Sequence, residues 1–313
     1  MTASAADDKA LPPALSGRAG HDPKLVPFAV TDGTVLAVLD VGPPTADATA
    51  VLVHGWTQDH TSWDDVTDEL SPYMRVVAYD GRGHGWSDAG PKGTATIEQI
   101  ADDLADVITG LVPHGRVVLA GHSLGGPVIM AFAERHPQLL TDRVSGVVLV
   151  STSAAGLGRD IFGLPPRMTA PLMLAQPLIT GVRKLSKSAV NFRYPGLLAI
   201  PLRFGLYGPG AATKHNRRRT AAQVSRSHPA TTAALVDEMA RHDRVPVLGD
   251  LDGTRTVVLA GTKDALTPIA HARAIVEAVP NAELVVYPRA GHMLPYERPA
   301  EVAAQITRLA SAT

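Results

Sequence analysis

The sequence contains no cysteine among its 313 residues. Disulfide bonds, thiolate nucleophiles and cysteine-ligated metals are therefore excluded, and the composition gives no information on the redox compartment. Internal repeats and low-complexity tracts are also missing. A chain of this length can bury a large core, as one large α/β domain or two smaller ones.

Neither charge sign is in excess. Lysine and arginine total 29 against 30 for aspartate and glutamate, which gives a formal net charge of -1 at pH 7. Without a basic excess to neutralise phosphates, nucleic acid is not an expected partner. The one basic cluster, KHNRRR (residues 214–219), is interpreted as a solvated loop or helix face, with contact to an anion or a membrane surface as the alternative.

Long apolar runs are absent too. The most apolar stretch, residues 170–182, is short and contains Pro171 and Pro177, so no integral membrane segment is expected. Residues 1–25 lack the apolar core of a signal peptide and are predicted to form a flexible arm. A cytoplasmic location is the default expectation.

What is present is an alternation of short Val- and Leu-rich runs with helical spacing, which is typical of parallel strands joined by crossover helices. Asp32-Gly33 predicts a hairpin, so the sheet should open with antiparallel strands. The alternation stops at about residue 154 and resumes at about residue 245. We expect an α/β core of residues 26–153 and 245–313, in a mostly parallel, doubly wound sheet of about eight strands, with a helical cap of residues 154–244 inserted after the sixth strand.

Ser123 lies in the segment VVLAGHSLGGPVIMAF (residues 117–132), between a predicted strand and a predicted helix. Gly121 and Gly125 flank it in the pattern G-x-S-x-G, which places a serine on a strained turn with little space for neighbouring Cβ atoms. An ordinary Gly-rich turn is the alternative. We interpret Ser123 as a nucleophile.

A serine nucleophile needs a base, and the base usually needs a carboxylate that orients it. His292 follows the last predicted strand, at the sheet edge where ligands of α/β proteins bind. Asp264 follows the preceding strand, whereas Asp250 and Asp252 come before that strand, on the opposite edge. Read alone, His292 is an exposed loop histidine and Asp264 a helix-capping residue; together with Ser123 they predict a catalytic triad.

Acyl transfer also needs N–H donors for the developing oxyanion. Leu124, directly after Ser123, offers its backbone N–H at a helix N-terminus. Trp56, in VLVHGWTQDH (residues 51–60), is the best candidate for the second N–H, since Gly55 permits the necessary bend. Alternatively, Trp56 is a residue of the pocket wall. Both roles can coexist, because the oxyanion donor is its backbone N–H.

These residues together resemble the α/β-hydrolase fold superfamily, specifically its capped serine hydrolases, from about residue 26 to the C-terminus. The resemblance rests on HGW (residues 54–56), on DGRGHGWS (residues 80–87), and on the chain order Ser123, Asp264, His292. It implies Ser123 as nucleophile, His292 as base and Asp264 as its orienter. It also implies oxyanion donors at Trp56 and Leu124, and bracing rather than catalytic roles for Arg82, His84 and Ser87. His122 should point away from the pocket.

The resemblance implies an esterase or lipase-like hydrolase that needs no cofactor and no metal. We expect a small or apolar ester substrate, because residues 161–181 are rich in Leu, Ile, Met and Pro, although these side chains could instead join the cap to the core. The residues expected around the substrate are His54, Gly55, Trp56 and Met293. Relatives that open epoxides or displace halide carry aspartate at the position of Ser123, so those activities are disfavoured.

Several alternatives use the same triad: lactone, thioester or carbon-carbon bond hydrolysis, and cofactor-free perhydrolysis of the haloperoxidase type. A ligand-binding protein of the same fold is a further alternative, and peripheral lipid contact through the apolar and basic cap is compatible with each. The sequence does not determine the oligomeric state.

Overall fold

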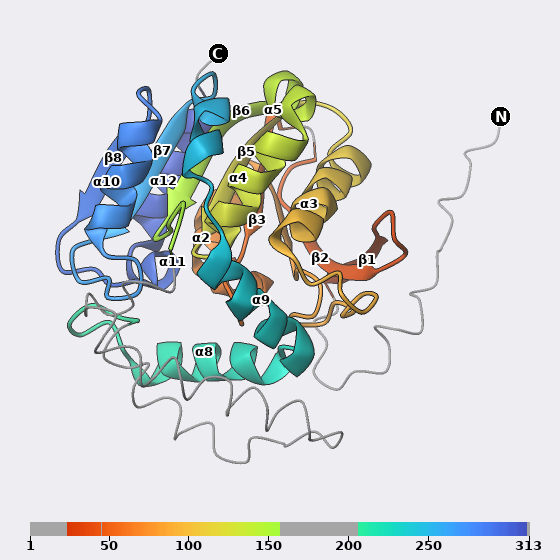
Figure 1. Cartoon of the computed structure of the whole chain (residues 1–313), viewed down its shortest axis with the longest axis horizontal. Helices are drawn as coiled ribbons and strands as arrows, with labels where there is room; N and C mark the ends of the chain where they lie inside the picture. Colours follow the sequence, from red (N-terminus) through yellow and green to blue (C-terminus); the bar gives the residue numbers. More distant parts are fainter. Residues whose placement is uncertain (1–23, 45, 157–205, 312–313) are drawn as a thin grey trace.

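The computed structural model describes residues 24–44, 46–156 and 206–311. At its centre lies an eight-stranded sheet with the order β1-β2-β4-β3-β5-β6-β7-β8 (Figure 1). The strands are β1 (Leu25–Ala29), β2 (Val35–Val41), β3 (Ala48–Val53), β4 (Arg75–Tyr79), β5 (Arg116–His122), β6 (Val144–Val150), β7 (Thr256–Gly261) and β8 (Glu283–Tyr287). Strands β3 to β8 are parallel, and β1 and β2 are antiparallel to their neighbours. The predicted fold class is confirmed.

The antiparallel start of the sheet is a hairpin of β1 and β2. Gly33 has a φ of 83°, a left-handed conformation that favours glycine. Asp32 accepts a hydrogen bond from the backbone N–H of Thr34 at 2.9 Å, which closes the turn. The Asp-Gly pair therefore forms the hairpin that the sequence predicts.

Most residues of the central strands are apolar because both faces of the sheet are covered. In β3, Val51 and Val53 belong to the core on one face, and Ala50 and Leu52 belong to the core on the other. Strands β5 and β6 alternate in the same way. This period of two follows from the pleat of a strand.

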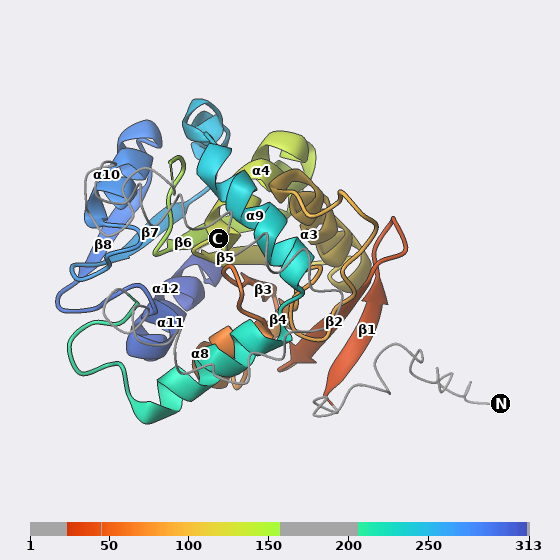
Figure 2. The ribbon, with the colours of Figure 1, turned by 60° about the horizontal axis from the view of Figure 1, so that its bottom comes forward.

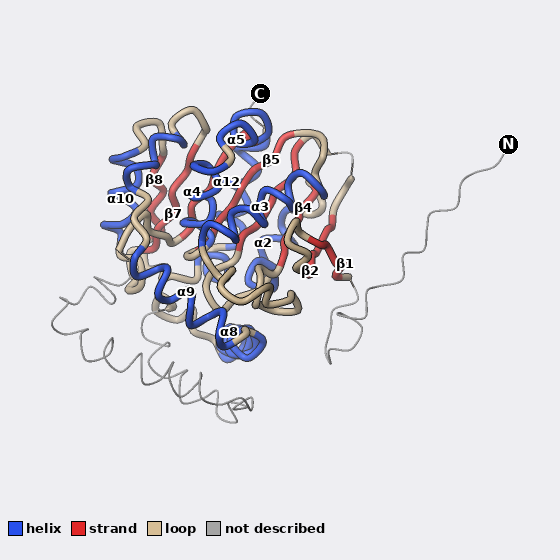
Figure 3. The backbone as a smooth tube through the Cα atoms, turned by 45° about the vertical axis from the view of Figure 1, so that its right-hand side comes forward, coloured by secondary structure: helices blue, strands red, loops and turns tan. Residues whose placement is uncertain are grey.

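Helices cover both faces of the sheet, and Figure 3 shows them in blue on either side of the red strands. The core that contains Val51 and Val53 includes side chains of α3 (Ile97–Leu111), α4 (Gly125–Arg135) and α10 (Ile269–Ala278). The core that contains Ala50 and Leu52 includes side chains of α2 (Asp64–Leu70) and α12 (Pro299–Ala310). The helices are η1 (His60–Trp63), α2 (Asp64–Leu70), α3 (Ile97–Leu111), α4 (Gly125–Arg135), α5 (Pro137–Arg143), α8 (Lys214–Arg226), α9 (Pro229–Arg241), η3 (Val245–Leu251), α10 (Ile269–Ala278), α11 (Leu294–Glu297) and α12 (Pro299–Ala310).

Between β6 and β7, the described residues 206–255 form α8, α9 and η3, with no strand among them. Figures 1 and 2 place α8 and α9 at the edge where the parallel strands end. Part of the predicted cap, residues 157–205, lies outside the described residues. The boundaries 154–244 stay a prediction, as does the arm of residues 1–25, of which Leu25 already belongs to β1.

Helix α8 carries the basic cluster and contacts the core through polar groups. The Arg219 guanidinium donates to both carboxylate oxygens of Asp65, at 2.9 and 2.8 Å. It also lies over the Tyr296 ring, 4.2 Å from the ring centroid. Lys214 and Arg218 are exposed. One side of the basic cluster, with Arg219, therefore contacts the core, and the other side, with Lys214 and Arg218, is exposed to solvent.

None of the described helices is both long enough and apolar enough to cross a membrane.

Candidate active site

Ser123 occupies a strained turn between β5 and α4. Its φ is 52°, in the left-handed region that non-glycine residues rarely adopt. Its backbone N–H donates to Val150 at the end of β6 (3.0 Å), and its carbonyl accepts from the Thr152 hydroxyl (2.7 Å). These contacts fix the turn, and the Ser123 residue is half-buried rather than enclosed.

The glycines around Ser123 have no space for a side chain. A Cβ on Gly121 would lie 2.4 Å from the carbonyl oxygen of Gly125. A Cβ on Gly125 would lie 2.3 Å from the carbonyl oxygen of Val53, and one on Gly126 would lie 2.1 Å from the Thr152 hydroxyl. The tight packing expected from G-x-S-x-G is therefore present at each of these glycines.

His292 and Asp264 form a buried pair. Nδ1 of His292 lies 2.9 Å from Oδ2 of Asp264, and the exposed fractions of the two side chains are 4% and 0%. The other carboxylate oxygen of Asp264 accepts from the backbone N–H groups of Leu266 (2.9 Å) and Thr267 (2.8 Å). The Thr267 hydroxyl donates to Oδ2 at 2.7 Å. Asp264 is thus oriented by four hydrogen bonds, one of them to the imidazole.

Electrostatics keep Asp264 ionised. Burial alone would raise the pKa of this carboxyl, but the charge of His292 and the hydrogen bonds from His292 and Thr267 outweigh burial and lower the pKa. An ionised Asp264 holds the Nδ1 proton of His292, so that Nε2 is left as the basic nitrogen.

The loop after β8 brings His292 back to β5. Nε2 of His122, the residue before Ser123, lies 2.9 Å from the carbonyl oxygen of His292. The ring centroids of the two histidines are 4.9 Å apart. Among the described residues no hydrogen bond joins the Ser123 hydroxyl to His292.

The two predicted oxyanion donors are available. Across the described ranges, the backbone N–H groups of Trp56 and Leu124 have no hydrogen-bond acceptor. Leu124 directly precedes α4, so its N–H lies at the positive end of that helix dipole. Trp56 lies in the loop after β3, at the same edge of the sheet.

His54 and Gly55, predicted substrate contacts, brace this loop. The backbone N–H of Gly81 donates to Nε2 of His54 (2.8 Å), and therefore Nδ1 of His54 carries the proton and donates to the Gly55 carbonyl (2.8 Å). Burial is the main cause that lowers the pKa of His54 and keeps it neutral. Both ring nitrogens of His54 thus contact backbone.

The other two predicted substrate contacts are Trp56 and Met293. The indole N–H of Trp56 donates to the carbonyl of Thr232 in α9 at 3.0 Å, and the Trp56 residue is half-buried. Met293 is fully buried and packs with Leu206 and Tyr207. Their contact with a substrate stays a prediction.

Arg82, His84 and Ser87 lie buried in the turn after β4. The Arg82 guanidinium forms two hydrogen bonds with Asp103, at 2.7 and 2.5 Å. Ser87 accepts from the backbone N–H of Ala37 at 2.9 Å. These contacts are those of bracing residues.

Asp59, His60 and Asp80 form a buried group of possible metal ligands within 4.8 Å of one another. Asp80 accepts from both the backbone N–H and Nδ1 of His60, each at 2.8 Å. Asp59 binds the Arg226 guanidinium at 2.8 and 2.6 Å. Since a fixed cation already neutralises Asp59, hydrogen bonds and an ion pair account for this group.

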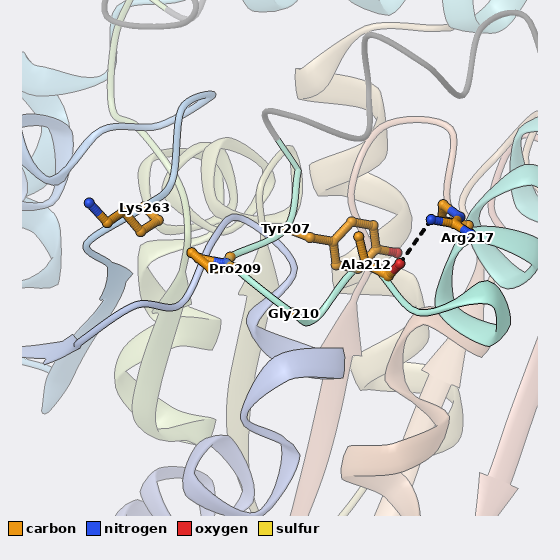
Figure 4. A pocket seen from close by; sticks show the side chains of 7 residues that line it. Tyr207, Pro209, Gly210, Ala212, Arg217 and Lys263 are labelled. Carbon is orange, nitrogen blue, oxygen red and sulfur yellow. Dashed lines mark hydrogen bonds between the residues drawn. The ribbon is translucent and has the colours of Figure 1, made fainter.

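A cavity of about 470 Å³ lies beside the loop that carries Asp264. Figure 4 shows Arg217 at one side of it, hydrogen-bonded to Ala212, and Lys263 at the other. Ser123 is not among the described residues that line it. The lining is formed by Tyr207, Gly208, Pro209, Gly210, Ala212, Arg217 and Lys263.

Sequence reasoning missed three residues that hold the site together: Gln58, Thr152 and Thr267. Gln58 accepts from the backbone N–H of Gly55 at 3.0 Å and lies against His122. None of the three belongs to a motif with a known spacing. Only the position of Gln58 shortly after HGW, and of Thr267 before a helix, could have drawn attention to them.

A profile of the alpha/beta hydrolase fold family matches residues 50–299. The chain belongs to this family. An uncharacterized protein of Mycobacterium tuberculosis is 27% identical over 295 residues, which cover 84% of this chain and 80% of that protein.

Solved structures agree with this assignment. A thermophilic esterase from Thermogutta terrifontis has a TM-score of 0.72 and 30% identity, covering 91% of this chain and 97% of the esterase. An enol-lactonase from Burkholderia xenovorans has a TM-score of 0.71 and 23% identity, covering 91% of this chain and 100% of the lactonase. At 23% identity, the similarity to the lactonase shows only that the two chains share a fold. Hydrolase chemistry is the activity that the family and the esterase support.

Proposed function

We propose that this protein is a serine hydrolase that cleaves carboxylic esters through an acyl-enzyme. The proposal rests on one arrangement: the left-handed Ser123 follows directly on His122, whose ring is hydrogen-bonded to the backbone of His292, and His292 is paired with the buried Asp264. The esterase of Thermogutta terrifontis supports the choice of an ester bond.

In the proposed reaction, the Ser123 hydroxyl attacks the ester carbonyl while Nε2 of His292 takes its proton. The N–H groups of Trp56 and Leu124 stabilise the negative charge on the carbonyl oxygen. The protonated His292 then donates to the leaving alcohol, and a water activated by His292 releases the acid. Catalytic hydrogen bonds are often long in ligand-free enzymes, and we expect the contact between Ser123 and His292 to tighten around the substrate.

We propose a small or apolar ester as substrate. The support for an apolar group comes from the composition of residues 161–181, IFGLPPRMTAPLMLAQPLITG, which lie outside the described residues. The cavity beside Asp264 has a mixed lining with two basic residues and adds no apolar preference of its own.

The test is labelling with a fluorophosphonate probe, together with turnover of p-nitrophenyl esters of graded acyl length. We expect the wild type to be labelled and active, and Ser123→Ala to be neither. Ser151→Ala is the matched control, because Ser151 also follows a strand with a left-handed φ of 46° but is only 1% exposed. It should be labelled like the wild type.

Folded wild type without labelling at Ser123 would favour a ligand-binding protein. Labelling without turnover of any ester, but with turnover of a lactone, an acyl-CoA thioester or peracid formation, would replace the ester by that substrate class.

A further inference from the structure

His122 is the residue x before the serine in the G-x-S-x-G pattern. The pattern allows any residue there and assigns it no role. The side chain is fully buried and points into the protein, where its two ring nitrogens meet two different loops. Nε2 faces His292 after β8, and Nδ1 faces Gln58 after β3, at 3.0 Å.

The proton count assigns different roles to the two ring nitrogens. A neutral imidazole carries one proton, and both atoms that face the His122 ring nitrogens, the His292 carbonyl oxygen and the Gln58 side-chain oxygen, can only accept. The Gly55 N–H can only donate, so the Gln58 atom that it meets is the amide oxygen, and the Gln58 amide nitrogen donates to the sulfur of Met293 at 3.3 Å. The Gln58 oxygen thus already has a donor in Gly55, whereas among the described residues the His292 carbonyl has no donor other than His122, so the single proton is assigned to Nε2. Nε2 therefore forms the hydrogen bond, and Nδ1 lies 3.0 Å from the Gln58 oxygen with no proton between them.

The backbone of His292 is held on both sides. Its N–H donates to the carbonyl of Leu206 at 2.9 Å, and its carbonyl accepts from His122 at 2.9 Å. Its imidazole is held by Asp264 at 2.9 Å. Of these three, only His122 is covalently next to the nucleophile.

The His122 ring is fully buried and packs against Gly55 and Trp63. A Cβ on Gly55 would lie 3.2 Å from Nδ1 of His122 and 2.9 Å from the oxygen of Gln58. The Trp63 ring meets the His122 ring at 88°, with the centroids 6.4 Å apart. The ring is thus confined by the loop after β3 while Nε2 holds the loop after β8.

We propose that His122 is a positioning residue that sets the distance between the base and the nucleophile, because Nε2 of residue 122 holds the backbone of His292 beside residue 123. This inference rests on the proposed function for its catalytic meaning. A misplacement of the base by about 1 Å can cost about a hundredfold in rate, so one backbone tether is enough to matter.

Two substitutions of His122 distinguish the roles of its two ring nitrogens. The side-chain amide nitrogen of glutamine can take the position of Nε2, whereas that of asparagine can take only the position of Nδ1. We expect His122→Asn to lower kcat about ten- to a hundredfold with KM within about twofold, and His122→Gln to keep kcat within about threefold. His122→Met fills the ring volume without a donor and should behave like His122→Asn; it replaces that variant if asparagine prevents folding. His242→Asn is the control for a buried histidine whose ring nitrogens have no hydrogen-bond partner among the described residues, and its kcat should stay within about twofold.

A readout without turnover keeps the two proposals distinguishable. The Nδ1 proton of His292, shared with Asp264, should give a far-downfield proton NMR signal that Asp264→Asn abolishes. We expect this signal in the wild type and in His122→Gln, and its loss or broadening in His122→Asn and His122→Met. Equal signals and equal kcat values in the asparagine and glutamine variants, whether high or low, would overturn the role of Nε2. A wild type with the NMR signal but without labelling at Ser123 would overturn only the proposed hydrolase.

Discussion

Asp264 and His292 meet through a single pair of atoms, Oδ2 and Nδ1, 2.9 Å apart and closed to solvent. The other carboxylate oxygen of Asp264 is committed to two backbone N–H groups, which can only donate. The orientation of the carboxylate is therefore fixed by the chain around it, and any group that replaces it must present an acceptor at the same place.

Asp264→Asn should abolish most activity for this reason. The amide oxygen must take the side of the N–H groups of Leu266 and Thr267, so the amide NH2 faces Nδ1 of His292 and forces the proton onto Nε2. We expect kcat to fall by about 10³- to 10⁴-fold. Thr267→Val removes one hydroxyl donor and should cost less than about tenfold. Steady-state kinetics on the best ester of the panel provides the measurement, and a loss below about tenfold in Asp264→Asn would contradict the role of Asp264.

Gly125→Ala should destabilise the fold. The added Cβ would lie 2.3 Å from the carbonyl oxygen of Val53, a backbone atom of β3 that cannot move alone. We expect a loss of about 1–3 kcal/mol in the free energy of unfolding in urea. Gly249→Ala is the control, since among the described residues no atom beyond its own stretch of chain lies within 4 Å of the added Cβ. Similar losses in the two variants would show that crowding at the elbow is not the cause.

Arg219→Met should loosen α8. This helix buries only Gln223, so its attachment depends on polar contacts, and those of Arg219 with Asp65 and the Tyr296 ring act beside the ion pair of Arg226 with Asp59. We expect about 1–2 kcal/mol of destabilisation and faster tryptic cleavage within α8. Arg218→Met, on the exposed side of the same helix, is the matched control. Unchanged cleavage in Arg219→Met relative to Arg218→Met would show that other contacts hold the helix.

The stability of the protein should fall with decreasing pH below about 6.5. Burial lowers the pKa of His84 and of His122 to about 3, and that of His242 to about 4. Between these values and the unfolded pKa of about 6.5, the unfolded chain binds protons that the folded chain does not, so stability rises with pH. Each group adds roughly 1 kcal/mol per pH unit in this window.

Urea unfolding between pH 4 and 8 measures this dependence, and His84→Asn should reduce its slope. His60 acts with the opposite sign: burial lowers its pKa, but the hydrogen bond and charge of Asp80 outweigh burial and raise it. Its contribution is present below the unfolded pKa and is lost as pH rises through the folded value. A flat profile between pH 4.5 and 6.5 would contradict the assignment of neutral buried histidines.

The elements that the sequence predicts well are those with a local cause. Asp32-Gly33 makes its own hairpin, and the apolar runs of β3, β5 and β6 need no partner to be recognised as buried strands. The short helices α5 and α11 were not predicted. They have 7 and 4 residues, begin with or contain an early proline, and gain their stability from the core rather than from a periodic pattern.

The residues of the candidate site also differ in whether a local sequence signal marks them. Ser123 was predicted from its glycines, and Asp264 and His292 from their places after strands. That His122 points away from a substrate pocket stays a prediction, and its partners, Gln58 and the carbonyl of His292, are 64 and 170 residues away along the chain. Bonds of this kind leave no mark in a local pattern.

The left-handed backbone at residue 123 also limits how this protein could change its chemistry over evolution. A threonine there would be strained, since β-branched residues are outliers in that region, whereas aspartate is several-fold enriched in it. The backbone at residue 123 therefore accepts an unbranched alcohol or a carboxylate side chain more readily than a β-branched alcohol. The backbone conformation at residue 123 therefore restricts which side chains this position accepts, independently of their reactivity.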